Sequence, residues 1–248
     1  MTRAEFRRMF MCQGPVITPV IHVLDRDQVL RNIGVAVKAG APGVFLINHD
    51  FPVGELIPII TDVRKFVPDV WIGVNFLAMP AKNAFPILGR LYAGDCPIDA
   101  YWADDARIDE RVERQIEADM TRKVYSVCGW NGLYFGGVAF KKQREVGRED
   151  FECAARLAAP YMDVVTTSGA ATGCAADTKK VSDFRRGLGD RPLALASGVN
   201  PENVTDYTDL VDCFLVATGI NYVSDFYNID PGRLDELIAI ACRHGEEH

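Results

Sequence analysis

The sequence predicts a single (β/α)8 barrel, a TIM-type α/β fold, and three observations support this. The chain has 248 residues, a common length for one such barrel. Eight short apolar runs alternate with amphipathic helical patterns along the chain. The last two runs each end in a small glycine-containing turn, as expected at the phosphate-binding end of this fold. No linker or change in composition divides the chain, so we expect one domain over residues 1–248.

The expected strands are short runs of mostly apolar residues, rich in β-branched and aromatic types, and each is followed by a helical pattern. The strands are predicted at residues 16–23, 43–47, 71–76, 100–103, 132–140, 163–168, 192–196 and 213–217. The main helices are predicted at residues 26–40, 56–67, 81–92, 109–127, 149–159, 178–188 and 231–241, with a shorter one opened by Pro201. A short amphipathic helix within residues 1–14 is expected to cover the bottom of the barrel.

Composition excludes several classes of protein. The net charge of −7 and the lack of a basic stripe argue against a nucleic-acid partner. No apolar run approaches the roughly 20 residues of a membrane-spanning helix, so no transmembrane segment is expected. The seven cysteines are scattered without a CxxC pair, and no signal peptide opens the chain. We therefore expect a cytoplasmic protein with reduced thiols, without a zinc site or disulfides, and with no cofactor.

The two glycine turns are the predicted phosphate site. Each follows a buried strand, and such turns present backbone N–H groups to an anion. In a (β/α)8 barrel the loops after strands seven and eight are the usual place for a phosphate. The candidate phosphate ligands are Ser197, Gly198, Asn200, Thr218, Gly219 and Asn221.

The loop after the sixth strand consists almost wholly of small residues, at positions 168–176. Small residues allow close approach of the backbone to a ligand and movement of a closing loop. We expect Ser168 and Gly169 to contribute to the substrate site beside the phosphate turns. Cys174 is a weaker candidate for a nucleophile, because no histidine stands near it in the sequence.

Lys141 is the first candidate catalytic residue, because it stands at the predicted end of strand five. If Lys141 faces the barrel interior, so do Ala139 and Gly137, and these small residues would leave room for its stem. Burial would lower the pKa of such an amine, as a Schiff-base or general-base lysine requires. The alternative interpretation is a solvated lysine that begins a loop together with Lys142.

Two more strand ends carry candidates for proton transfer. His22 shares a face with Thr18 in the predicted first strand and would serve as an acid or base near neutral pH. A hydrogen-bonded histidine at the barrel mouth without a chemical role is the alternative. Asp104 and Asp105 are adjacent and must point to opposite sides, so one is expected in the site and the other in a loop cap.

The remaining strand ends offer polar groups for binding. Asn48 and Asn75 are expected to orient a substrate through hydrogen bonds. His49 and Asp50 would be metal ligands together with His22 only if more ligands joined them. Two histidines and scattered carboxylates are weak support for a metal, so no metal site is predicted.

Several motifs together resemble the BtpA/SgcQ-type barrel family. They are SGAATG (168–173), SGVNPENV (197–204), ATG (217–219), NIDPGR (228–233) and IGVNFL (72–77), with His22 and Asn48. The resemblance extends over nearly the whole chain and is densest from residue 163 onward. It implies a cytoplasmic TIM-type barrel grouped with ribulose-phosphate-binding barrels, in a family without a settled activity.

The sequence also departs from the pattern of that family. Ile47 stands where the family tends to carry Glu, and Trp102 replaces an expected Arg. Gly137 and Ala139 occupy the expected Asp and His positions, whereas Lys141 matches. Shared ligand architecture is thus better supported than a shared reaction.

These patterns predict an enzyme that acts on a small phosphorylated substrate, either a sugar phosphate or a ribosyl phosphate. An aldolase, isomerase or lyase would use Lys141 to polarise a carbonyl and Asp104 or His22 to move protons. A phosphoribosyl-transfer or N-glycosidic reaction remains an alternative within the enzymes. A non-catalytic barrel that binds a metabolite or a partner protein is the alternative outside them. A homo-oligomer is compatible with either function.

Overall fold

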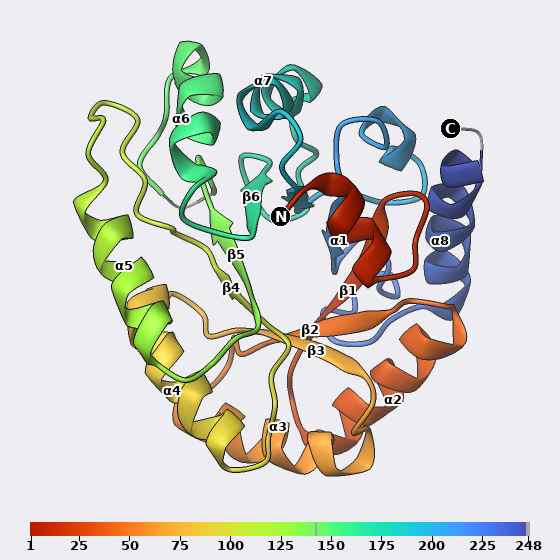
Figure 1. The fold of residues 1–248 in the computed structure, drawn as a ribbon. Coiled ribbons are helices and arrows are strands. Elements are labelled where there is room, and N and C mark those ends of the chain that lie inside the picture. Colours follow the sequence, from red (N-terminus) through yellow and green to blue (C-terminus); the bar gives the residue numbers. More distant parts are fainter. Residues whose placement is uncertain (142, 247–248) are drawn as a thin grey trace.

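The computed structural model describes residues 1–141 and 143–246, and its eight strands form one closed parallel barrel. Each strand pairs with its neighbour in sequence order, and β8 closes onto β1 with Val16 opposite Cys213. Helices surround the barrel, with α1 lying across one end (Figure 1). The predicted (β/α)8 fold is confirmed.

The strands lie within the runs that the sequence indicates. They are β1 (Val16–His22), β2 (Gly43–Ile47), β3 (Trp71–Asn75), β4 (Ala100–Ala103), β5 (Leu133–Gly137), β6 (Val164–Ser168), β7 (Leu193–Ala196) and β8 (Cys213–Val216). The helices are α1 (Arg3–Met9), α2 (Arg26–Lys38), α3 (Val53–Phe66), α4 (Ala81–Ala93), α5 (Ile116–Val127), α6 (Phe151–Ala158), α7 (Thr178–Leu188) and α8 (Pro231–Glu246), with 3-10 turns at Arg148–Asp150 and Val204–Asp206.

Alternation along the strands divides the apolar side chains into two cores. Phe45, Trp102 and Phe135 fill the barrel interior, where the Phe45 and Phe135 rings meet edge to face with centroids 5.2 Å apart. Gly73 leaves room for Phe45, because a Cβ at this position would overlap the phenyl ring. The other face of each strand packs against the helices and includes Tyr101. The interior is therefore a packed core that supports a site only at its end.

The bottom of the barrel is closed by α1, as the sequence predicts. Phe6 is fully buried and contacts the Phe135 ring inside the barrel. Asp212, which is also fully buried, holds the helix there through ion pairs with Arg3 at 2.8 Å and Arg7 at 3.2 Å. Its second carboxylate oxygen accepts from Arg185 of α7 at 2.8 Å. One carboxylate thus joins α1 and α7 to the start of β8.

Two predicted helices begin later than expected or do not form. The pattern predicts a helix from residue 109, but α5 begins at Ile116. Gln115 folds the preceding segment into turns, since its side chain accepts from the Asp109 N–H and donates to the Asp109 and Val112 carbonyls. Side-chain bonds to the local backbone here replace the first helical turns.

The helix expected at Pro201 is replaced by turns and the 3-10 turn Val204–Asp206. Asn200 and Asn203 each accept the backbone N–H of the other, at 3.0 Å, which fixes a tight turn instead of a helix start. The turn after β7 consequently has no α-helix N-terminus behind it, so only turn N–H groups and nearby cations are left to bind the predicted phosphate there.

Strand five is also shorter than predicted, because it ends at Gly137 rather than Phe140. Ala139 adopts a left-handed φ of 46°, which breaks the strand geometry. The expected alternation of Gly137, Ala139 and Lys141 on one face is therefore wrong, and Lys141 approaches the barrel mouth from a loop. Lys142, which follows it, lies outside the described residues.

The seven cysteines are free thiols in this structure. Within the described residues, no helix combines the length and the apolar character that crossing a bilayer demands.

We expect Asp212→Asn to lower the free energy of unfolding by about 3 kcal/mol, because it leaves three arginines around a buried neutral group. Urea denaturation at pH 7 measures this loss. Asp206→Asn, at an exposed carboxylate of the 3-10 turn, is the matched control and should change stability by less than about 0.5 kcal/mol. Equal losses in the two variants would contradict the role of Asp212.

Candidate active site

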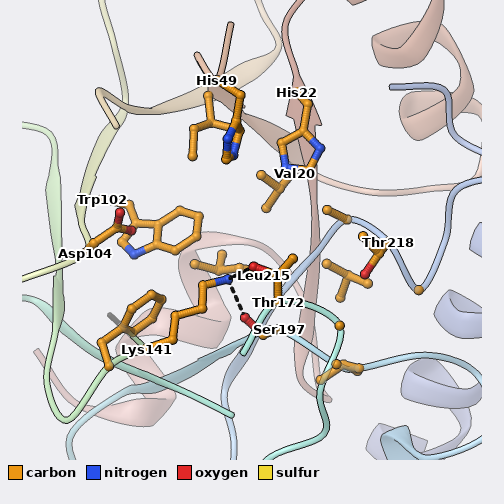
Figure 2. Close-up of a pocket in the computed structure, with 18 of the residues that line it drawn as sticks. Val20, His22, His49, Trp102, Asp104, Lys141, Thr172, Ser197, Leu215 and Thr218 are labelled. Atoms are coloured by element: carbon orange, nitrogen blue, oxygen red, sulfur yellow. Dashed lines mark hydrogen bonds between the residues drawn. The ribbon is translucent and has the colours of Figure 1, made fainter. Parts of the chain in front are cut away.

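A cavity opens at the carboxyl ends of the strands, where active sites of this fold lie. It has about 80 Å3 of space for the centres of water molecules and about 730 Å3 of empty space in all, with the part open to solvent included. Val20, Ile47 and Leu215 from the barrel interior contribute to its apolar lining. Figure 2 shows Lys141, Thr172 and Ser197 together on one side, with Trp102 and the imidazoles of His22 and His49 around the other.

The turns after β7 and β8 both line this cavity, as the sequence predicts. Ser197, Gly198, Thr218 and Gly219 are among its lining residues. Ser197 and Gly198 adopt left-handed φ values of 80° and 70°. A non-glycine residue in this conformation is strained, and such strain concentrates at functional sites.

Glycines bring the backbones of three loops into direct contact. A Cβ on Gly198 would overlap the carbonyl of Cys174 in the loop after β6. A Cβ on Gly219 would overlap the carbonyl of Val199 in the turn after β7. Thr172 and Gly173 of the loop 168–176 also line the cavity, and the expected approach of this backbone to a ligand stays a prediction.

Four backbone N–H groups in these turns are available for a ligand. Among the described residues, the N–H groups of Gly198, Val199, Thr218 and Gly219 have no hydrogen-bond acceptor. All four residues line the cavity. Backbone N–H groups of successive turn residues can form an anion-binding concavity.

The ammonium of Lys141 reaches the same turns. Its Nζ donates to Ser197 Oγ at 2.7 Å and lies 3.3 Å from Thr172 Oγ1. The Lys141 backbone N–H donates to Ser168 Oγ at 2.8 Å, which ties its loop to the end of β6. A positive charge therefore stands at the edge of the four free N–H groups.

Lys180 and Gln143 hold the loop that carries Lys141, and the sequence pattern did not indicate either residue. Lys180 Nζ donates to the Ala139 carbonyl at 2.6 Å and to the Ser168 carbonyl at 2.8 Å. Its charge also lies 5.3 Å from the centroid of the Phe151 ring. Burial lowers the pKa of Lys180 to about 8.

Gln143 acts at the other end of this loop. Its side-chain amide donates to the Asp104 carbonyl, and its Oε1 accepts the Phe140 N–H at 3.1 Å. In the sequence, Lys180 falls within a predicted helix and Gln143 within a predicted loop. Their roles depend on contacts between distant segments, so no local signal marks them.

Of the two adjacent aspartates, Asp104 faces the cavity. Asn75 donates to Asp104 Oδ1 at 2.9 Å and fixes the carboxylate. Asp105 points away, where it accepts the Arg107 N–H at 2.8 Å and caps a loop. The expected division between a site residue and a capping residue is therefore present.

His22 lies in the cavity on the inward face of β1, but its ionisation differs from the prediction. Burial lowers the pKa of His22 to about 4, so the imidazole is neutral at pH 7. Its Nδ1 lies 2.8 Å from the Phe226 carbonyl, which can only accept, so we assign the proton to Nδ1. His22 thus does not titrate near neutral pH, and its Nε2 is left as an acceptor.

The segment between β8 and α8 covers His22. The Phe226 ring stacks on the imidazole with centroids 3.7 Å apart, and His49 meets it edge to face at 4.8 Å. The Tyr227 carbonyl accepts from Gln28 at 2.7 Å, and the Tyr227 hydroxyl donates to Asp50 at 2.9 Å. These bonds anchor the segment over the ends of β1 and β2.

Other predicted ligand residues lie beside the cavity and hold its loops. Asn48 donates to the Phe51 carbonyl at 2.7 Å and accepts the Leu77 N–H at 3.1 Å, so it joins the loops after β2 and β3. Ser168 and Gly169 line a neighbouring groove. Neither Asn200, bonded to Asn203, nor the buried Asn221 is a lining residue of the cavity. Their direct contact with a ligand stays a prediction.

A metal centre is not evident from the arrangement. Across residues 1–141 and 143–246, no group of three or more His, Cys, Asp or Glu side chains is placed to hold a metal ion. The carboxylate of Asp50, considered beside His22 and His49, is engaged by the Tyr227 hydroxyl.

Comparison with solved structures shows the same fold in several enzymes. Tryptophan synthase subunit alpha from Legionella pneumophila aligns over 100% of this chain and 99% of its own, with a TM-score of 0.65 and 11% identity. A phosphoribosylanthranilate isomerase from Thermotoga maritima aligns over 92% and 98%, with a TM-score of 0.61 and 17% identity. A structure described as native KDPGal covers 94% and 96%, with a TM-score of 0.60 and 12% identity.

At these identities the similarity shows the shared barrel fold. No protein-family model matches the chain, and no curated protein matches it. The resemblance to the BtpA/SgcQ-type family therefore stays a prediction from the motifs.

The low pKa of His22 predicts a specific loss of stability in acid. The unfolded chain binds a proton near pH 6.5 and the folded chain only near pH 4, so stability falls as the pH drops between these values. The loss from this group should reach about 3 kcal/mol. His22→Asn preserves a donor for the Phe226 carbonyl but does not titrate. Urea unfolding of both proteins from pH 7 to pH 4 measures the difference, and parallel pH profiles would contradict the prediction.

Proposed function

We propose that the chain is an enzyme that acts on a small phosphorylated substrate, with the phosphate held by the turns after β7 and β8. One observation carries this proposal. Four backbone N–H groups without acceptors, at Gly198, Val199, Thr218 and Gly219, line one cavity together with the Lys141 side chain. Turn N–H groups and a lysine are complementary to a phosphate in charge and in hydrogen bonding.

The chemistry would take place beside the phosphate. Lys141, bonded to Ser197 beside the turns, would polarise a carbonyl or form an imine, and the Asp104 carboxylate, held by Asn75, would move a proton. The neutral His22 would accept a hydrogen bond from a substrate hydroxyl through Nε2. This division of roles supports an aldolase, isomerase or lyase type of reaction, in the cytoplasm.

The proposed family is the BtpA/SgcQ type, and a non-catalytic barrel of that type is the second candidate. Apolar or small residues at positions 47, 102 and 137 favour it, since the family tends to carry polar groups there. A binding protein would hold the same phosphate without turnover. Loss of turnover in Asp104→Asn with retained phosphate binding would distinguish the enzyme from this candidate.

The phosphate site predicts a response to inorganic phosphate and to ribose 5-phosphate. Both should raise the melting temperature of the protein, since each binds the folded state alone. Gly198→Ala should lower phosphate affinity at least about tenfold, because the new methyl group overlaps the Cys174 carbonyl.

Gly129→Ala is the matched control, because Gly129 has a φ of 76° and open space around it. Both substitutions place an alanine at a left-handed φ, but only Gly198→Ala adds a methyl group that overlaps the neighbouring loop at the cavity. Isothermal titration of the two variants measures the affinities. Equal affinities, or no binding of phosphate to the unmodified protein, would contradict the proposed site.

An imine on Lys141 is directly testable. Its amine would condense with a substrate carbonyl and release water, and borohydride would then reduce the C=N bond to a stable secondary amine. Incubation with dihydroxyacetone phosphate and borohydride should add the reduced triose phosphate to Lys141, as peptide mass spectrometry can show. Lys141→Met should abolish the adduct, whereas Lys82→Met at an exposed ion pair should not. An unmodified Lys141 in an enzyme that turns this compound over would exclude the imine and leave carbonyl polarisation.

A further inference from the structure

The cavity has two chemically different halves. One half contains the turn N–H groups, the Ser197 hydroxyl and the Lys141 ammonium. The other half is mainly carbon, with Trp102 and Leu77 above the apolar floor, and the Phe140 ring lies between the two halves, its centroid 5.7 Å from Lys141 Nζ. Figure 2 shows Trp102 next to Lys141, with the imidazoles of His22 and His49 farther from Ser197. A substrate that places its phosphate in the turns must therefore place its remaining atoms against these side chains.

A long hydroxylated chain is a poor match for this second half. Its hydroxyl groups would lose water and meet phenyl and aliphatic surfaces, which can neither donate nor accept in place of water, and an indole whose single donor, the Trp102 Nε1–H, is itself buried. Buried hydroxyl groups without partners oppose binding. The polar groups near this half are few, namely Asp104, His22 and His49. These three side chains can serve one reacting centre, but they are too few to form hydrogen bonds with a row of hydroxyl groups.

A flat ring fits the same surroundings. The Trp102 indole is 5% exposed and is held edge to face by Phe140, with centroids 5.8 Å apart, and by Phe45 at 6.0 Å. His22 is fixed between Phe226 and its hydrogen bond to the backbone. Rigid ring surfaces of this kind favour stacked or edge-to-face contact with another ring. The neutral state of His22 at pH 7 also means that this half supplies no cation from His22 to pair with a second anionic group.

We propose that the substrate carries a planar aromatic group beside its phosphorylated part, and that the half of the cavity around Trp102 binds this ring. The inference rests on the proposed function, since it takes the phosphate position as given. It narrows the substrate class from any small phosphorylated molecule to one with an aromatic substituent.

Three probe compounds test the proposed phosphate site and the proposed aromatic group separately in the intact protein. Inorganic phosphate tests the turns alone, glycerol 3-phosphate adds a hydroxylated chain, and phenyl phosphate adds a ring. By isothermal titration we expect phenyl phosphate to bind at least about tenfold more tightly than glycerol 3-phosphate. Equal affinities for these two esters, with phosphate bound, would overturn the aromatic group and leave the proposed function standing. Failure of all three to bind would overturn the proposed phosphate site itself.

Trp102→Leu tests the ring contact directly, because leucine keeps the apolar character and removes the flat surface. It should reduce the preference for phenyl phosphate over inorganic phosphate about fivefold. Trp130→Leu is the matched control, since Trp130 lies in the outer core with its indole N–H bonded to the Ile98 carbonyl. The control should keep the preference of the unmodified protein. An unchanged preference in Trp102→Leu would overturn the assignment of the ring to the half of the cavity around Trp102. If a variant does not fold, the comparison of the three compounds in the unmodified protein still tests whether the substrate carries an aromatic group.

Discussion

Direct contact between the backbones of three loops is the constraint on which the site depends. At Gly198 and Gly219 the main chains of neighbouring turns approach so closely that a single Cβ would overlap a carbonyl. Glycine permits this approach because it has no side chain. Within the loop after β6, a Cβ at Gly169 would likewise overlap the Cys174 carbonyl. The nested turns bring unpaired N–H groups together at one place, and the proposed chemistry is arranged around that place.

The side chains that line the cavity beside these turns are held in position by polar contacts with neighbouring residues. Lys180 pins the carbonyls of Ala139 and Ser168, and this determines where the loop that carries Lys141 leaves the barrel. Its ammonium is costly to bury, as the lowered pKa of Lys180 shows, but carbonyl groups and the Phe151 ring offset part of that cost. Asn75 likewise holds Asp104 in position, because its side-chain amide donates to the Asp104 carboxylate. Buried polar residues thus position the groups that face a ligand.

Much of the fold could be predicted, because hydrophobic periodicity reports burial directly. The strands, their order and the bottom position of α1 follow from runs of apolar residues and their spacing. The errors arose where side chains bond to the local backbone. Gln115 delays α5, Asn200 and Asn203 replace a helix by a turn, and the left-handed Ala139 ends β5 early. Such bonds leave no trace in a hydrophobic pattern, so the alternation drawn through Lys141 was wrong.

The candidate site, like the fold, could be predicted from the sequence only in part. The sequence by itself determined the barrel, the two glycine turns after β7 and β8, and the strand ends at or next to which His22 and Asp104 lie, because all of these follow from local pattern and a general property of the fold. Tertiary structure alone decided which of Asp104 and Asp105 faces the cavity, and it made His22 neutral by burying it beneath Phe226. It also brought Lys141 to the phosphate turns through Lys180. Direction, burial and charge depend on residues far apart in the chain, and only the folded arrangement places them together.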